Sequence, residues 1–261
     1  MNNYCFVIPN YNHSQNIASV IDALAGMNMQ IIMVDDGSDA QTKAVIRALS
    51  QRYSKLKIVT HNSNQGKGGA VQSGLRQARL DGYSHALQID ADGQHNLNDV
   101  SRMLELSQAH PEDLISGKPV YDDSVPKSRL YGRYITHFWV WIETLSFSVE
   151  DTMCGFRVYP LHQVIPLLNK ERLGKRMDFD IEVMVKLYWR GVNIQFVPTK
   201  VIYAEDITSH FRPLEDNVLI SWMHTRLFLR MLVRLPNLLA RNQRRRRMQK
   251  ALPVQSAGSG R

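Results

Sequence analysis

Short apolar runs and helical repeats alternate through the first 117 residues. The apolar runs predict five strands, at residues 4–9, 30–34, 56–60, 85–90 and 113–117. The segments between them have helical spacing, at residues 14–26, 40–52, 68–82 and 97–110. Alternating strands and helices are typical of an α/β fold, with a mostly parallel central sheet flanked by helices on both faces.

The second half of the chain has a less regular pattern. We expect a long helix rich in aromatic residues at 127–149, a helix at 178–190 and a strand at 193–203. A further helical pattern covers residues 216–241, where Pro236 predicts a kink or a break. Residues 251–261 have a composition typical of a disordered end.

Polar motifs follow three of the predicted strands: PNYN, DDGSD and DADGQH. Ligands of parallel sheets bind beyond the carboxyl ends of the strands, so one cleft is expected to collect all three motifs. Asp90 and Asp92 crowd two carboxylates around Ala91, a repulsion that a divalent cation with oxygen ligands would relieve. The alternative is a solvated turn that uses Asp and Gly only for their backbone preferences.

Two further motifs carry candidate chemistry. In VDDGSD, Asp35 or Asp36 is a candidate acceptor for a ribose hydroxyl or a base N–H, while Ser38 or Asp39 could cap the next helix. The Gly-rich NQGKGGAVQSG segment opens a helix, and its amides and Lys67 could neutralise phosphate. A polar turn, and glycines that allow close helix packing, are the respective alternatives.

Bulk properties narrow the class of protein. The chain of 261 residues is long enough for a large core, and two cysteines suggest neither a disulfide framework nor a zinc site. No apolar stretch is long enough to span a bilayer and no signal peptide is evident, which favours a cytoplasmic protein. The net charge of +8 is concentrated after residue 211, which argues against a nucleic-acid-binding body.

Five motifs together resemble one enzyme family. VIPNYN, VDDGSD, NQGKGGA, DADGQH and DTMCGFRVY occur in the order and spacing of the family-2 type inverting glycosyltransferases, and the dolichyl- or polyprenyl-phosphate sugar synthases are the most similar subgroup. The resemblance implies a GT-A (Rossmann-like) domain over residues 1–212, with a nucleotide-sugar-binding half at 1–117 and an acceptor half at 118–212. Residues 213–250 would then form a helical extension.

The resemblance also implies roles on the donor side. The residues matched to nucleotide-sugar binding are Pro9, Tyr11, Asp35, Asp36, Lys67, Gly68, Asp90, Ala91 and Asp92. Asp90, Asp92 and Gln94 match the metal ligands, with Mg²⁺ or Mn²⁺ as the expected cofactor, and Asp92 is also counted as catalytic.

On the acceptor side, Asp151 matches the position of a catalytic base, although the adjacent Glu150 stays open as an alternative. The residues matched to phosphate or acceptor binding are Arg129, Arg133, Arg157, Ser209, His210 and Arg212. Arg129 and Arg133 are four residues apart and share a helix face, and Arg157 could pair with its own loop instead. His210 departs from the family pattern, in which lysine is usual.

The C-terminal segment is predicted to be a basic amphipathic helix. Arg226, Arg230 and Arg234 recur every four residues among apolar residues, and further arginines follow. Such a helix can lie in an anionic membrane interface, or it can pack on the core with a solvated basic end.

The sequence therefore predicts a metal-dependent inverting glycosyltransferase that moves a sugar from a UDP- or GDP-sugar to a lipid or lipid-phosphate-like acceptor. It is expected to act as a peripheral protein at the cytoplasmic face of the cell membrane, without nucleic acid. The alternatives are a nucleotidyltransferase and a catalytically silent sugar-nucleotide-binding membrane scaffold. The first usually has an Arg/Lys-containing Gly-rich loop after its first strand, where this chain has Asn10, Tyr11 and Asn12.

Overall fold

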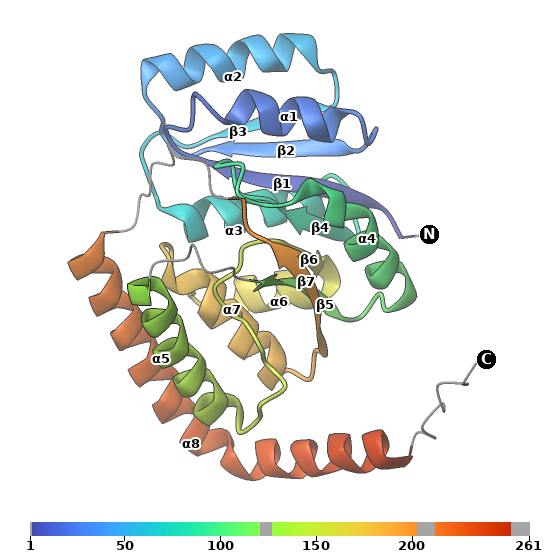
Figure 1. Ribbon diagram of the computed structural model, residues 1–261, viewed down its shortest axis with the longest axis vertical. Coiled ribbons are helices and arrows are strands. Elements are labelled where there is room, and N and C mark those ends of the chain that lie inside the picture. Colours follow the sequence, from blue (N-terminus) through green and yellow to red (C-terminus); the bar gives the residue numbers. More distant parts are fainter. Residues whose placement is uncertain (1, 121–126, 203–211, 252–261) are drawn as a thin grey trace.

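The computed structural model describes residues 2–120, 127–202 and 212–251, with the side chains of 127–131 and 244–251 left out of the description. A seven-stranded sheet runs through the molecule (Figure 1). Its strands are β1 (Tyr4–Asn10), β2 (Gln30–Asp35), β3 (Leu56–Thr60), β4 (His85–Gln88), β5 (Leu114–Val120), β6 (Arg157–Pro160) and β7 (Ile194–Lys200).

The helices alternate with the strands as predicted in the first half. They are α1 (Ile17–Ala25), α2 (Ala40–Arg52), α3 (Lys67–Leu80), a short 3₁₀ turn η1 (Leu97–Asp99), α4 (Val100–Ala109), α5 (Lys127–Thr144), α6 (Leu161–Lys170), α7 (Asp178–Trp189) and α8 (Pro213–Ala251). Asp39 caps α2 by accepting a hydrogen bond from the Thr42 amide at 2.8 Å, one of the two predicted caps.

The strand order is β3-β2-β1-β4-β6-β5-β7. All pairings are parallel except those of β6, which runs antiparallel to both β4 and β5. The mostly parallel sheet is therefore confirmed. The sequence missed β6 and α6, because β6 is only four residues long and α6 contains Pro166.

Each face of the sheet has its own hydrophobic core. Along β1, Phe6 and Ile8 point into the cluster under α1, α2 and α4, while Cys5 and Val7 point into the cluster under α3, α6 and α7. All four side chains are fully buried, as expected for a strand covered on both faces.

Two predicted elements end elsewhere than expected. The strand predicted at 85–90 ends at Gln88, so Asp90 lies in the loop beyond it. The helix predicted at 127–149 ends at Thr144, and Leu145 has a positive φ of 52° that ends the helical path.

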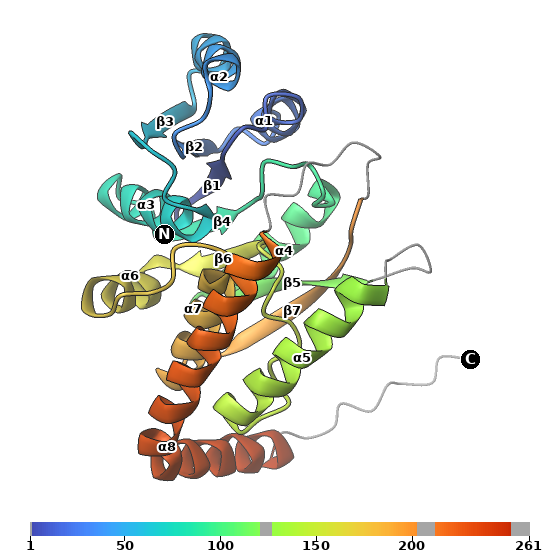
Figure 2. The same ribbon diagram turned by 90° about the vertical axis from the view of Figure 1, so that its left-hand side faces the viewer.

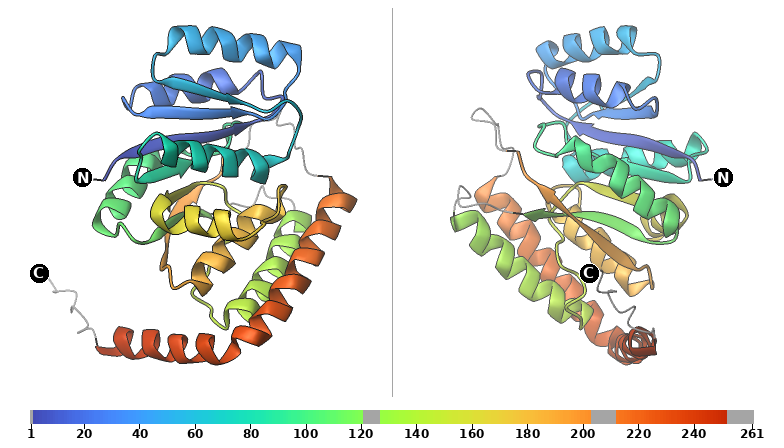
Figure 3. Two further views of the ribbon diagram at one scale, coloured as in Figure 1. Left: turned by 180° about the vertical axis from the view of Figure 1, so that it is seen from behind. Right: turned by 45° about the vertical axis from the view of Figure 1, so that its right-hand side comes forward.

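Helix α8 is longer than predicted and packs against α5 and α7. Figures 1 and 3 show it bent along its length, and Pro236 lies inside it, which supplies a cause for the kink. The helix ends at Ala251, the first residue of the segment predicted to be disordered. The rest of that segment, residues 252–261, lies outside the described residues. No described helix is both long and apolar enough to cross a bilayer.

Candidate active site

The strand directions bring distant motifs to one edge of the sheet. Strands β1 to β4 are parallel, so Asn10, Asp36, His61 and Asp90 follow their carboxyl ends at a common edge. Because β6 is antiparallel, its amino end lies at the same edge and delivers Gly155 there. The cleft expected from the three polar motifs is therefore built at this edge.

An ion pair between Asp90 and Lys67 lies at the centre of the site. Lys67 Nζ is 2.7 Å from Asp90 Oδ2 and 3.2 Å from Asp180 Oδ2, so one ammonium group bridges two carboxylates. His95 Nε2 lies 3.4 Å from the same Asp90 oxygen. Asp180 belongs to α7, which ties this cluster to the second half of the chain.

The surrounding charges hold both groups ionised. Burial by itself would raise the pKa of Asp90, but the charge of Lys67 and the hydrogen bond from His95 bring that pKa well below its usual range. Burial would likewise lower the pKa of Lys67, but Asp180 and Asp90 raise it above its usual value.

Gly155 provides the space for this pair. A Cβ atom at this position would lie 2.7 Å from Lys67 Nζ and 2.8 Å from Asp90 Oδ2. Both distances are shorter than a Cβ contact tolerates, so any side chain here would push the charged groups aside. This glycine is part of the DTMCGFRVY motif, but the sequence alone does not reveal what it touches.

Asp92 and Gln94 lie in the turn that follows. Asp92 Oδ1 accepts the Gln94 amide at 3.0 Å, and the Asp92 carbonyl accepts Asn16 Nδ2 at 3.2 Å. Gly93 adopts a φ of +75°, as the turn requires, and Ala91 is buried. The Gln94 carbonyl accepts the Ile202 amide at 2.9 Å, which attaches the turn to the chain beyond β7.

The donor set of this turn fits a divalent cation that is completed by phosphate oxygens. Asp90 and Asp92 offer two carboxylates, which is how Mg²⁺ or Mn²⁺ is held when a substrate supplies the other ligands. Within the described ranges, no group of three or more His, Cys, Asp or Glu residues forms a complete metal cage. A protein-only metal site is therefore not present in that part of the chain.

The residues expected at the nucleoside have structural partners. Asp36 is buried and accepts hydrogen bonds from the Gln65 and Gly66 amides at 2.9 and 2.8 Å, and its Oδ1 lies 2.6 Å from His61 Nδ1. Asp35, also buried, accepts the Ser38 amide at 3.1 Å. These two carboxylates shape the loops around the cleft.

Asn10, between the buried Pro9 and the half-buried Tyr11, differs from these carboxylates in its hydrogen bonding. It is 1% exposed, yet neither its amide nitrogen nor its amide oxygen has a hydrogen-bond partner among the described residues. A buried amide without partners is uncommon, and a bound ligand is one way to satisfy it. This residue belongs to the PNYN motif, in which the sequence pointed to Pro9 and Tyr11 as nucleotide-sugar-binding residues.

The Gly-rich loop has a packing role in addition to its charge. A Cβ at Gly68 would lie 2.3 Å from Phe179 Cβ, so α3 and α7 approach each other too closely for a side chain. Gly66 has a φ of +91°, a conformation that favours glycine. The alternative interpretation, glycines for close helix packing, holds for Gly68, while Lys67 points to Asp90.

Asp151 is the acidic centre of the acceptor half. Its Oδ2 accepts a hydrogen bond from Arg133 Nε at 2.6 Å and lies 3.4 Å from His137 Nε2. Its Oδ1 accepts the Met153 and Cys154 amides at 3.0 and 2.8 Å. Burial would raise the pKa of Asp151, but the His137 hydrogen bond and the charge of Arg133 lower it below its usual range. The alternative base, Glu150, is exposed and pairs with Lys118 Nζ at 2.5 Å.

The remaining basic candidates are spread over the structure. Arg157 is fully buried and donates to the Thr152 and Asp180 carbonyls, both at 2.6 Å, which is the loop pairing that the sequence left open beside phosphate binding. Arg212 is exposed and pairs with Glu215 at 2.9 Å. The Arg129 side chain, Ser209 and His210 lie outside the described residues.

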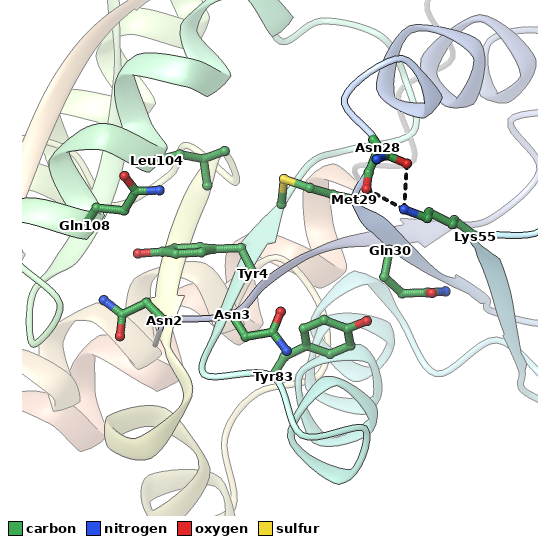
Figure 4. Close-up of a pocket in the computed structure, with 10 residues that line it drawn as sticks. All are labelled: Asn2, Asn3, Tyr4, Asn28, Met29, Gln30, Lys55, Tyr83, Leu104 and Gln108. Atoms are coloured by element: carbon green, nitrogen blue, oxygen red, sulfur yellow. Dashed lines mark hydrogen bonds between the residues drawn. The ribbon is translucent and has the colours of Figure 1, made fainter.

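A pocket of approximately 380 Å³ lies at the opposite edge of the sheet (Figure 4). Its lining includes Gln30 at the amino end of β2, and Asn3 and Lys55, which directly precede β1 and β3. The Lys55 ammonium already donates to the Asn28 carbonyl and side-chain oxygen, at 2.7 and 2.6 Å. This pocket is therefore separate from the carboxyl-edge site.

The two halves of the site are joined by a short segment. Asp151 contacts Arg133, and four residues later Gly155 lies against Asp90 and Lys67. Four peptide units span at most about 15 Å, so the backbone at Asp151 lies within that distance of the backbone at Gly155. A mostly parallel α/β domain with ionised carboxylates beyond the carboxyl ends of its strands belongs to the class of α/β proteins that bind ligands at this edge.

The comparison with known families identifies the group within that class. Residues 5–164 match the family model for glycosyl transferase family 2, so the chain belongs to this family. The prediction of a glycosyltransferase is thereby confirmed at the level of the family.

Curated relatives share about a quarter of their residues with this chain. It is 26% identical over 216 residues to the UDP-N-acetylglucosamine–dolichyl-phosphate N-acetylglucosaminyltransferase of Methanococcus voltae, covering 76% of this chain and 85% of that protein. It is 27% identical to the dolichyl-phosphate beta-glucosyltransferase of Saccharomyces cerevisiae, covering 74% of this chain but only 64% of the yeast protein.

Solved structures confirm the GT-A fold. Glucosyl-3-phosphoglycerate synthase from Mycobacterium tuberculosis, in complex with phosphoglyceric acid, has a TM-score of 0.63 at 16% identity over 88% of this chain and 80% of its own. A mannosyltransferase from Pyrobaculum calidifontis, in complex with GDP-Man and Mn²⁺, has a TM-score of 0.55 at 14% identity over 99% of this chain and 76% of its own.

Proposed function

We propose that this protein is a metal-dependent, inverting glycosyltransferase that transfers a sugar from a UDP- or GDP-sugar to a lipid-phosphate acceptor. The observation that carries the proposal is the pairing of two acidic centres: Asp90 with Lys67 at the carboxyl edge of the sheet, and Asp151 with Arg133 beside it. The names of the curated relatives support a dolichyl-phosphate-like acceptor.

On the donor side, Asp90 and Asp92 are the residues proposed to hold Mg²⁺ or Mn²⁺. The cation would supply positive charge beside the leaving diphosphate. The Mn²⁺ and GDP-Man complex of the Pyrobaculum mannosyltransferase supports this expectation for the fold. Lys67 keeps Asp90 ionised and is itself close enough to face a phosphate group bound at Asp90.

On the acceptor side, Asp151 accepts hydrogen bonds from Arg133 and from two backbone amides, and His137 Nε2 lies 3.4 Å away. Its low pKa makes it a weak proton acceptor, which suits an acceptor phosphate that is already anionic. We propose that Asp151 orients Arg133, whose charge attracts the acceptor phosphate. The phosphate oxygen then attacks the anomeric carbon from the face opposite the leaving diphosphate, which inverts the configuration.

The location proposed for this reaction is the cytoplasmic surface of the cell membrane, where a lipid acceptor and a soluble nucleotide-sugar meet. Family membership favours this reading over a nucleotidyltransferase. A silent scaffold would retain nucleotide-sugar binding but show no turnover.

The test is sugar transfer from radiolabelled UDP- and GDP-sugars to a short-chain polyprenyl phosphate, with Mn²⁺ or Mg²⁺ present. We expect Asp92→Ala to lower turnover at least about 100-fold while the protein stays folded, because among the described residues the Asp92 side chain bonds only the Gln94 backbone amide in its own turn. Asp22→Asn, a surface carboxylate beside Arg52, is the matched control and should be fully active. Unchanged turnover in Asp92→Ala would contradict the role of this turn, and product with retained anomeric configuration would contradict inversion.

A further inference from the structure

Helix α8 has an apolar face that packs on the protein. Met223, Leu227 and Met231 are almost completely buried, and Met223 and Leu227 belong to the core cluster that includes α7 residues. His224 Nδ1, on the same side, lies 2.7 Å from the buried Glu143 of α5. Of the two interpretations of the C-terminal helix, packing on the core is therefore realised in this part of the chain.

The arginines of α8 also face the protein body. Arg226 lies 3.6 Å from Glu182, and Arg230 lies 3.0 Å from Glu171. The Arg234 guanidinium lies over the Trp189 ring at 5.3 Å. The sequence predicts that these arginines form the polar face of an amphipathic helix. In the structure they lie along one edge of the buried face, beside the acidic and aromatic residues of the protein body.

The outer side of α8 is left apolar. Positions three or four residues apart, from Leu214 through Trp222 and Leu229 to Ala240, form one exposed stripe that is apolar except for Thr225 and carries no charge. Val233 is 83% exposed, Val218 67% and Trp222 59%. A helix of a protein surrounded only by water normally places polar residues on this side.

Helix α5 extends the same surface. Tyr134, Ile135 and Phe138 are exposed, and the half-exposed Trp139 packs edge-on against Phe228 of α8, with ring centroids 6.2 Å apart. Figure 2 shows α5 and α8 side by side along one flank of the molecule, as the contacts between them require. We call the surface with Ile135, Phe138, Val218, Trp222, Leu229 and Val233 at its centre the outer apolar face.

We propose that the outer apolar face is a docking surface that inserts into the interfacial region of an anionic lipid bilayer. Contiguous exposed apolar patches mark interaction sites, and exposed Trp and Tyr side chains such as Trp222 and Tyr134 suit the boundary between lipid headgroups and acyl chains. The partly exposed Arg230 borders the stripe with positive charge, which complements anionic headgroups. The sequence adds four consecutive arginines at positions 244 to 247 of the same helix.

This orientation also brings Arg133 and Asp151 close to the lipid surface, an inference that rests on the proposed function. Helix α5 carries Phe138 on the outer apolar face, while Arg133 on another side of the same helix pairs with Asp151. A helix is only about 10–12 Å wide with its side chains. A phosphate at the lipid surface would therefore need to extend past a single helix to reach Arg133.

The experiment measures sedimentation of the full chain with vesicles of phosphatidylcholine containing phosphatidylglycerol, without donor or acceptor sugar. We expect a Val218→Glu, Leu229→Glu, Val233→Glu variant to lose binding at least about tenfold, because each charge opposes insertion. The matched control is Leu80→Glu, which alters a residue 79% exposed on α3 and should bind as the unmodified protein does. Thermal melts followed by circular dichroism check that each variant is folded. If a glutamate substitution prevents folding, serine replaces it at the same position.

A second measurement localises the contact. The two native cysteines are buried, so an environment-sensitive fluorophore on Val233→Cys reports from the face, and one on Gln51→Cys in α2 is its control. A blue shift on vesicle addition is expected only at position 233. Equal vesicle binding by the triple-glutamate variant and the unmodified protein would overturn the proposal. Absence of vesicle binding by the unmodified protein would overturn it too, and light scattering would then show whether the face instead joins two copies of the chain in a dimer or is left exposed in a monomer. Transfer to a short-chain, water-soluble acceptor needs no docking, so activity that persists in the triple variant separates failure of docking from failure of the proposed reaction.

Discussion

Lys67 Nζ lies 2.7 Å from Asp90 Oδ2, so the lysine occupies the carboxylate that the sequence assigns to a metal ion. The second carboxylate, Asp180, accepts the same ammonium at 3.2 Å. Its other oxygen is buried without a hydrogen-bond partner in the described part of the chain and lies 3.9 Å from Arg157 Nη1. The lysine thus has a second anion available when a cation takes Asp90.

Lys67→Met removes this competing charge. The free protein should become less stable, because two partly buried carboxylates lose their shared partner. Mn²⁺ should then bind about tenfold more tightly and restore thermal stability, because it replaces the missing positive charge. Thermal unfolding with and without Mn²⁺ checks this, and Lys57→Met, which breaks the exposed pair with Asp81, is the control. A Mn²⁺ response no greater than that of the unmodified protein would contradict the competition.

Gly155→Ala should damage the site directly. Its methyl group would lie within 3 Å of Lys67 Nζ and Asp90 Oδ2 and would displace one of them. We expect donor affinity to fall on the order of tenfold with Mn²⁺ present, measured by calorimetric titration of UDP and GDP. Gly132→Ala on α5, where an added methyl meets nothing within 4 Å, should leave affinity unchanged. Equal affinities for both variants would remove Gly155 from the site.

Asn10→Ala and Asn242→Ala are a matched pair of buried asparagines. The Asn10 side-chain amide makes no hydrogen bond with the described residues, so its removal should cost less than about 1 kcal/mol of stability but weaken nucleotide binding. The Asn242 side chain accepts a hydrogen bond from the Tyr188 hydroxyl and donates to the Thr144 and Leu145 carbonyls. Its removal should therefore cost about 2–3 kcal/mol of stability without changing nucleotide affinity. Urea unfolding and nucleotide titration distinguish the two, and a large stability loss in Asn10→Ala would contradict the assignment.

Arg133→Gln should produce a pH-dependent loss of stability. In the folded protein the pKa of Asp151 lies below its unfolded value of about 3.9, so its ionisation contributes stability above that pH, and this is lost as pH falls through the folded pKa. Without Arg133, burial raises that pKa, and we expect a loss of about 1–3 kcal/mol at pH 7 that shrinks towards pH 4. Urea denaturation at both pH values checks the sign. A loss that is equal at the two pH values would show that Arg133 acts through packing alone.

Much of the first half followed from the sequence. The apolar runs located β1 to β5, the polar motifs fell at one sheet edge, and Asp39 was one of two predicted helix caps. These features depend on residue order within a few positions, where side-chain period and turn chemistry act locally.

The short β6 and the proline-containing α6 did not follow from the sequence, because their pairing and burial come from distant partners. The site residues Asp180, His95, His137 and Gly155 were missed for the same reason. No local signal connects Asp180 on α7 with Lys67 on α3, or Gly155 with Asp90, because sequence separation hides the contact.

The sequence by itself determined the alternating α/β pattern, the acid-rich strand ends and the amphipathic character of the C-terminal helix. Only the tertiary structure decided which way that helix faces. Its arginines find Glu171 and Glu182 on the protein body, and its second apolar side, with Trp222 and Val233, is left outward. The physical reason is that helical periodicity defines faces, whereas the partner for each face is chosen by the charges and surfaces that folding brings beside it.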